Sequence, residues 1–118
     1  SSGHMAILGN RIEGNQTDGE GGGINGFNAK ARVNNNIITG NIADEGGGIY
    51  NCGFDKQMTI INNTIYQTTG DAVQLGGATN VNVRNNILWV SGGYAMNVSS
   101  TSQPGFQSIC TSTLPLAA

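Results

Sequence analysis

The sequence predicts an all-β protein, a parallel β-solenoid of about four rungs. Three observations carry this prediction: a motif with paired asparagines recurs along the chain, a glycine-rich segment follows each copy, and apolar residues alternate with polar ones around both. Alternation of this kind indicates strands rather than helices. A unit of about 25 residues is too short to bury an apolar face alone, so successive units must stack on one another.

The composition agrees with this fold class. Gly contributes 19 and Asn 16 of the 118 residues, and both residues tolerate positive φ and favour turns. Only 10% of the residues are charged and the net charge is −2, which argues against a partner that is a nucleic acid. No apolar run approaches the roughly 18 residues that a membrane span requires.

Residues 1–5 are typical of an expression-tag scar, and they contain His4, the only histidine. The rest of the sequence therefore offers no His for a nucleophilic pair, a zinc site or a general base. We expect the repeats to occupy residues 6–106 and residues 107–118 to form a C-terminal tail or cap. Cys52 and Cys110 are either two unrelated thiols or a disulfide, because bridging depends on the separation of their Cα atoms.

The asparagine motif occupies residues 7–12, 33–38, 60–65 and 83–88, and the glycine-rich segments begin at Gly21, Gly46, Gly70 and Gly93. Stacking in register predicts four inward columns: Ile7, Val33, Ile60 and Val83; Ile12, Ile38, Ile65 and Leu88; Ile24, Ile49, Val73 and Met96; and Ala31, Met58 and Val81, which Met5 of the scar also fits. Aliphatic side chains stacked one strand spacing apart, about 4.8 Å, would supply the core.

Four asparagines also fall in register. Asn10, Asn36, Asn63 and Asn86 are separated by 26, 27 and 23 residues. A turn residue repeated at this period predicts an asparagine ladder, in which each side-chain amide hydrogen-bonds to the next rung. Without such partners a buried Asn would cost about 1–3 kcal/mol. The alternative is a set of exposed turn asparagines that are selected only for positive φ.

The segments NNIITGN, NNTIYQT and NNILWVS, each followed by GGGI or a variant, resemble the repeats of right-handed parallel β-helix proteins. These include pectate lyase-like folds and Asn/Gly-rich repeat proteins of bacterial surfaces. The resemblance covers residues 6–106 and implies a single-stranded right-handed parallel β-helix and a secreted or cell-surface location. The same rungs serve lyases, hydrolases, adhesins and inert spacers. The family's catalytic residues do not carry over, because the sequence has no adjacent Asp pair and no basic residue beside Asp44 and Glu45.

Five carboxylates flank the glycine-rich segments: Asp18, Glu20, Asp44, Glu45 and Asp71. If stacking gathers them at one corner, they repel one another unless a cation bridges them, and oxygen ligands suit Ca²⁺. One alternative is a set of solvated turn residues. Another is an acid–base pair, which needs carboxyl groups roughly 5–9.5 Å apart. Apart from a Ca²⁺ ion at this corner, we expect no cofactor.

An outward column lies one residue past the second inward column: Glu13, Thr39, Tyr66 and Trp89. Exposed aromatic rings beside polar groups bind the apolar faces of sugars or mark a protein interface. Arg84, at a nearby outward position, would add a donor for carboxylates. Tyr66, Trp89, Arg84 and Glu13 are therefore candidate ligand-binding residues. The alternative is that a loop or the C-terminal tail covers the rings.

The predicted function is a non-catalytic structural or binding segment of a larger secreted or surface protein, with polysaccharide as the candidate partner. One alternative is a fragment of a polysaccharide lyase or glycoside hydrolase with its site on the outer face near Tyr66, Arg84 and Trp89. Another is a module that self-assembles into a homo-oligomer, because a solenoid leaves unpaired strand edges at its ends. Convergence of acids and a base would distinguish an enzyme from the other two classes.

Overall fold

The computed structural model describes residues 4–27, 30–52, 57–67, 69–76, 80–98, 105–107, 110–111 and 116–117. All regular elements in this part of the chain are strands, and they form three parallel sheets of five strands each. The described residues contain no helix, and hence none that is long and apolar enough to cross a membrane.

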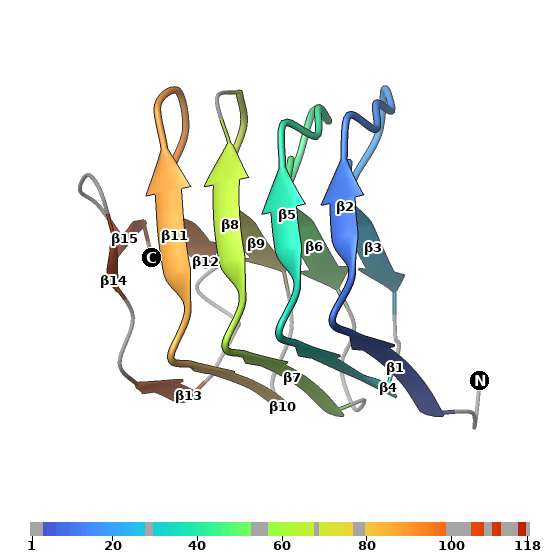
Figure 1. Ribbon diagram of the computed structural model, residues 1–118. Coiled ribbons are helices and arrows are strands. Elements are labelled where there is room, and N and C mark those ends of the chain that lie inside the picture. The colour runs from blue at the N-terminus through green and yellow to red at the C-terminus, as the bar shows by residue number, and fades with distance from the viewer. Residues whose placement is uncertain are drawn as a thin grey trace.

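Each sheet takes one strand from every coil of the chain, so that neighbours in a sheet come from consecutive coils (Figure 1). Sheet A contains β1 (His4–Leu8), β4 (Lys30–Asn34), β7 (Gln57–Ile61), β10 (Asn80–Arg84) and β13 (Gly105–Gln107). Sheet B contains β2 (Arg11–Glu13), β5 (Ile37–Thr39), β8 (Thr64–Gln67), β11 (Ile87–Val90) and β14 (Cys110–Thr111). Sheet C contains β3 (Ile24–Phe27), β6 (Ile49–Cys52), β9 (Val73–Gly76), β12 (Met96–Val98) and β15 (Leu116–Ala117).

The turn from sheet A to sheet B explains the paired asparagines of the motif. The first Asn of each pair has a positive φ, 60° at Asn35, 59° at Asn62 and 57° at Asn85. This left-handed conformation, which Asn tolerates better than most residues, bends the chain within two residues. The second Asn of each pair is thereby directed into the coil. The alternative of exposed, positive-φ turn asparagines is therefore wrong for Asn36, Asn63 and Asn86, which are buried, and positive φ is found instead at the asparagine that precedes each of them.

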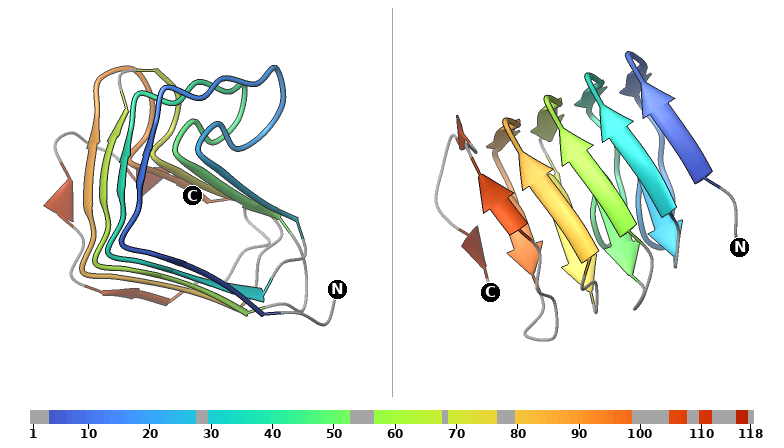
Figure 2. Two further views of the ribbon diagram at one scale, coloured as in Figure 1. Left: turned by 45° about the vertical axis from the view of Figure 1, so that its right-hand side comes forward. Right: turned by 90° about the horizontal axis from the view of Figure 1, so that it is seen from below.

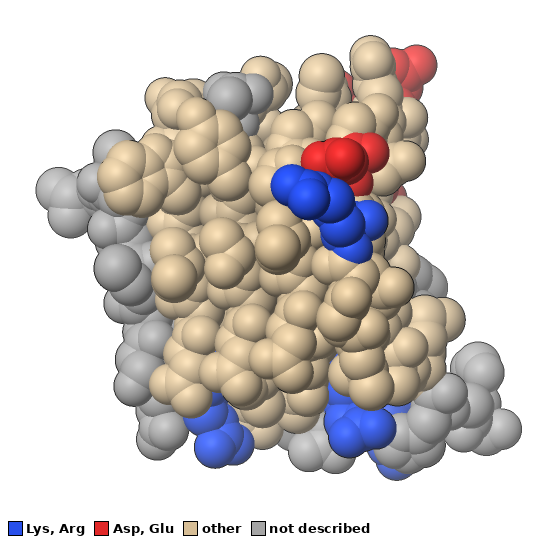
Figure 3. All heavy atoms as spheres, in the orientation of Figure 1, with Lys and Arg blue, Asp and Glu red and all other residues tan. Residues whose placement is uncertain are grey.

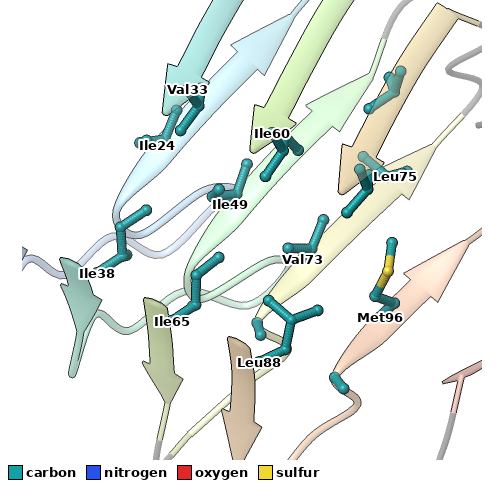
Figure 4. Close-up of a cluster of buried hydrophobic side chains, with 14 of the residues drawn as sticks. Ile24, Val33, Ile38, Ile49, Ile60, Ile65, Val73, Leu75, Leu88 and Met96 are labelled. Atoms are coloured by element: carbon teal, nitrogen blue, oxygen red, sulfur yellow. The ribbon is translucent and has the colours of Figure 1, made fainter. Parts of the chain in front are cut away.

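The predicted inward columns form the core. Strand pairing places Ile7 beside Val33, Ile12 beside Ile38 and Ile24 beside Ile49, and the later coils continue each column in the same register. In the second to fourth coils these side chains are fully buried (Figure 4). Each contributes roughly 1.5–3 kcal/mol through burial. Met5 pairs with Ala31 as the register predicts, but Met5 itself is 57% exposed.

The connections from sheet B to sheet C differ in length between coils. Residues 14–23 and residues 40–48 make this connection in the first two coils, whereas residues 68–72 and 91–95 make it in the next two. The longer connections project beyond the shorter ones at one corner of the cross-section (Figure 2). The shorter third connection is the main reason why the last interval of the asparagine ladder is 23 rather than 27 residues.

The C-terminal segment continues the stack. The short strands β13, β14 and β15 pair in parallel with β10, β11 and β12. Each sheet thereby gains a fifth strand of two or three residues, and two of these strands, β14 and β15, lie within residues 107–118, the predicted tail or cap.

Candidate functional site on the outer face of sheet B

The asparagine ladder holds the coils together beside this face. Oδ1 of Asn63 accepts hydrogen bonds from the backbone N–H of Asn36 at 2.9 Å and from its Nδ2 at 3.0 Å. Oδ1 of Asn86 accepts the equivalent pair from Asn63 at 2.8 and 3.0 Å, and Oδ1 of Asn36 accepts from Asn10 at 2.9 and 3.3 Å. The predicted ladder is therefore present along all four asparagines, and it fixes the start of β2, β5, β8 and β11.

A second amide ladder, which the sequence analysis missed, borders the other end of the same strands. Oδ1 of Asn41 accepts hydrogen bonds from the backbone N–H and from Nδ2 of Asn15, both at 3.0 Å. The N–H of Asn41 donates to Oε1 of Gln67 at 3.2 Å, and Nε2 of Gln67 donates to the carbonyl of Asn41. A detectable signal existed, because Asn15 and Asn41 are separated by 26 residues, like the first two members of the predicted ladder.

Between the two ladders, sheet B exposes the predicted outward column. Strand pairing places Glu13 beside Thr39, Thr39 beside Tyr66, and Tyr66 beside Trp89. Tyr66 is 43% and Trp89 is 51% exposed, so the described residues do not cover the rings. Because they occupy paired positions on adjacent strands, the two aromatic residues are neighbours on one surface.

A second outward row on the same strands adds to this surface. Arg11, Ile37, Thr64 and Ile87 are paired in register, two residues before the aromatic row. Ile37 and Ile87 are large and exposed, and they join Tyr66 and Trp89 on the outer face. These isoleucines are not among the predicted site residues, although each directly follows a ladder asparagine and therefore points outward by alternation. We call Ile37, Tyr66, Ile87 and Trp89 the apolar patch.

The other two candidate ligand-binding residues lie apart from the rings. Arg84 ends β10 and belongs to sheet A, on the far side of the asparagine turn from Trp89. Glu13 lies in the aromatic row but two strands from Tyr66, and its Oε2 is 3.3 Å from Nε of Arg11. The four residues therefore do not converge on one site.

The acidic residues do not gather as predicted. Glu20 and Glu45 pair across the two long connections, but Asp71 is engaged elsewhere. Its Oδ1 accepts a hydrogen bond from the backbone N–H of Tyr94 at 2.8 Å, and its Oδ2 accepts one from Nδ2 of Asn97 at 3.0 Å. Among the described residues, no group of three or more His, Cys, Asp or Glu side chains is arranged to hold a metal ion. Asp18 and Asp44 complete no such group.

The cysteines lie on different sheets and in distant coils. Cys52 ends β6 in the second coil, and Cys110 begins β14 in the fifth. Three coil spacings of about 4.8 Å separate them along the stack by about 14 Å. A disulfide requires Cα atoms less than about 7 Å apart, so this fold does not bring the two cysteines into bridging distance.

Coils that stack three parallel sheets, with amide ladders at the turns, define a β-solenoid of the parallel β-helix class. The family model described as the right-handed beta helix region matches residues 1–109, and the chain therefore belongs to the right-handed β-helix family. No curated protein and no solved structure gives a significant match to the chain.

Proposed function

We propose that the chain is a non-catalytic β-helix segment of a larger secreted or surface protein, and that the outer face of sheet B binds polysaccharide. The observation that carries the proposal is the apolar patch, in which Tyr66 and Trp89 are neighbours and both about half exposed. Sugar rings present C–H groups on one face and hydroxyls at the edge. An amphipathic aromatic surface matches that chemistry.

Polar groups lie where a sugar on the patch would need them. Thr39 precedes Tyr66 in the aromatic row, and Thr64 lies between Ile37 and Ile87 in the neighbouring row. Their hydroxyls can donate to and accept from sugar hydroxyls. Contiguous exposed apolar side chains rimmed by polar groups are also typical of binding surfaces rather than of inert ones.

The non-catalytic part of the proposal rests on the positions of the charged residues. Cleavage of a glycan by either predicted chemistry requires an acid and a base at the scissile bond. On the outer face of sheet B the described charged residues are Arg11 and Glu13, which are paired with each other at the end away from Trp89. Arg84, the predicted basic partner of the rings, belongs to sheet A.

The test is retention of the chain on immobilised polysaccharides at fixed ionic strength, with Trp89→Ala and Tyr66→Ala as variants. Tyr94→Ala is the matched control, because Tyr94 is similarly exposed but lies in the connection after β11 rather than on sheet B. We expect each patch variant to weaken retention about 2- to 10-fold, as loss of one aromatic contact of about 0.5–1.5 kcal/mol implies. The proposal is contradicted if Tyr94→Ala weakens retention as much as Trp89→Ala does, or if no polysaccharide retains the chain.

A further inference from the structure

The charges on sheet B point to the kind of glycan that this face accepts. The strands β2, β5, β8 and β11 present eight outward side chains: Arg11, Glu13, Ile37, Thr39, Thr64, Tyr66, Ile87 and Trp89. Only Arg11 and Glu13 are charged, and Nε of Arg11 lies 3.3 Å from Oε2 of Glu13. The six outward positions of the next three strands are uncharged. Figure 3 shows this face, with one contact between basic and acidic side chains and a large uncharged area beside it.

Among the described side chains of this face, an acidic glycan would find one cation, Arg11, which lies at the end away from Trp89 and contacts Glu13 through Nε. Binding a carboxylate-bearing sugar requires Arg or Lys donors, but Arg11 already faces a carboxylate. The other cations whose side chains the structure describes, Lys30, Arg32 and Arg84, all belong to sheet A. A uronic acid on the apolar patch would lose water from its carboxylate without gaining a charged partner, which is unfavourable.

The direction of the glycan follows from the shape of the face. Along the strands, only two outward positions fit between the two amide ladders, because the strands of sheet B are three or four residues long. Across the strands, the aromatic row continues from coil to coil at about 4.8 Å per step. Thr39, Tyr66 and Trp89 therefore form a row along the stacking axis, and a chain of sugars contacts all three only if it runs in that direction.

We infer that the polysaccharide bound by this face is neutral, and that it lies along the solenoid axis over Thr39, Tyr66 and Trp89 with the Arg11–Glu13 pair at one end. This inference rests on the proposed function and gives its ligand class and orientation. Because the contacts are spread over three coils, the ligand is an oligosaccharide rather than a single sugar.

The class of ligand is tested by affinity electrophoresis in gels that contain a neutral polymer (hydroxyethylcellulose or glucomannan) or an acidic one (polygalacturonate or alginate), at two salt concentrations. We expect retention by a neutral polymer, unchanged by salt and weakened about 2- to 10-fold by Trp89→Ala. Glu13→Gln removes the carboxylate that contacts Arg11 and should increase retention by an acidic polymer at low salt. Arg84→Gln, which alters a cation on sheet A, should change retention by neither polymer.

The orientation is tested by two variants with the same chemistry. Thr39→Trp extends the aromatic row along the axis, whereas Thr64→Trp adds a ring along the same strand as Tyr66. We expect Thr39→Trp to strengthen retention by the neutral polymer at least 2-fold and Thr64→Trp to have a smaller effect. A larger gain from Thr64→Trp would overturn the orientation.

The outcomes separate this inference from the proposed function. If only acidic polymers retain the chain and Trp89→Ala abolishes that retention, the neutral ligand is refuted and the polysaccharide-binding function stands. Retention by no polymer would refute both. Circular dichroism shows whether each variant is folded, so that retention is compared only between folded chains.

Discussion

Replacing Asn63 by Ala is the sharpest test of the asparagine ladder, because this residue lies in the middle of it and is 1% exposed. Its Oδ1 accepts two hydrogen bonds from Asn36, from the backbone N–H at 2.9 Å and from Nδ2 at 3.0 Å. Its Nδ2 donates to the carbonyl of Val33 at 2.8 Å and to Oδ1 of Asn86 at 3.0 Å. The substitution removes all four of these side-chain hydrogen bonds.

The loss in stability follows from the groups that remain without a partner. The N–H of Asn36 loses its acceptor, Oδ1 of Asn63, and the carbonyl of Val33 loses its amide donor, in a place that bulk water does not reach. Each buried unsatisfied group costs about 1–3 kcal/mol, so the free energy of unfolding should fall by about 2–6 kcal/mol. A domain of this size has only about 5–15 kcal/mol in total.

Asn10→Ala is the matched control for this prediction. Asn10 belongs to the same ladder, but it is exposed at the first coil, and water can replace its bonds to Leu8 and Asn36. We expect it to cost less than about 1 kcal/mol. Urea unfolding followed by circular dichroism measures both variants through their midpoints and slopes. Equal destabilisation by Asn63→Ala and Asn10→Ala would refute the reasoning, because burial would then not determine the cost.

Two further pairs of substitutions test the packing of the coils. Ile65→Ala empties a fully buried position of the second inward column and should lower the free energy of unfolding by about 2–5 kcal/mol. Its control, Ile87→Ala on the outer face, should change stability by less than about 0.5 kcal/mol. If thermal unfolding shows Ile87→Ala to be the more destabilising, the assigned faces are wrong. Gly48→Ala places a Cβ against the carbonyl oxygen of Ala72 and 2.9 Å from Cγ2 of Ile65, and should lower the free energy of unfolding by about 1–3 kcal/mol or more. In the control, Gly19→Ala, the added Cβ meets nothing closer than 3.9 Å, so this variant should unfold at the same urea concentration as the unmodified chain.

Much of the fold could be predicted because one physical requirement repeats. Parallel stacking forces residues one coil apart into register, so a period visible in the sequence fixes which side chains are neighbours. The pairs Ile12 with Ile38 and Ile65 with Leu88 follow directly from that period. The fifth set of strands was harder to predict: Phe106 and Leu116 pair with Val83 and Met96 of two predicted columns, but the paired asparagines and the glycine-rich segment that mark the earlier units are missing there.

The candidate site was predictable only where it follows the same register. The neighbouring positions of Tyr66 and Trp89 were predicted, since both follow an inward residue of one column. The expected corner of carboxylates was not found, because the connections that carry these residues differ in length and the Asp71 carboxylate accepts hydrogen bonds from Tyr94 and Asn97 of the next coil. Period alone cannot place residues in connections whose lengths vary from coil to coil.

The division between inward and outward positions also explains why the outer face of sheet B is informative about function. Inward columns hold similar aliphatic side chains in every coil, because each must pack on the coil before and after it. The aromatic row, in contrast, changes from Glu13 to Thr39, Tyr66 and Trp89 while the backbone register stays the same. Packing within the coil does not demand two exposed aromatic rings at the third and fourth positions of that row. A ligand that contacts the row along the axis would use both rings, and this is the physical basis for proposing this face as the binding surface.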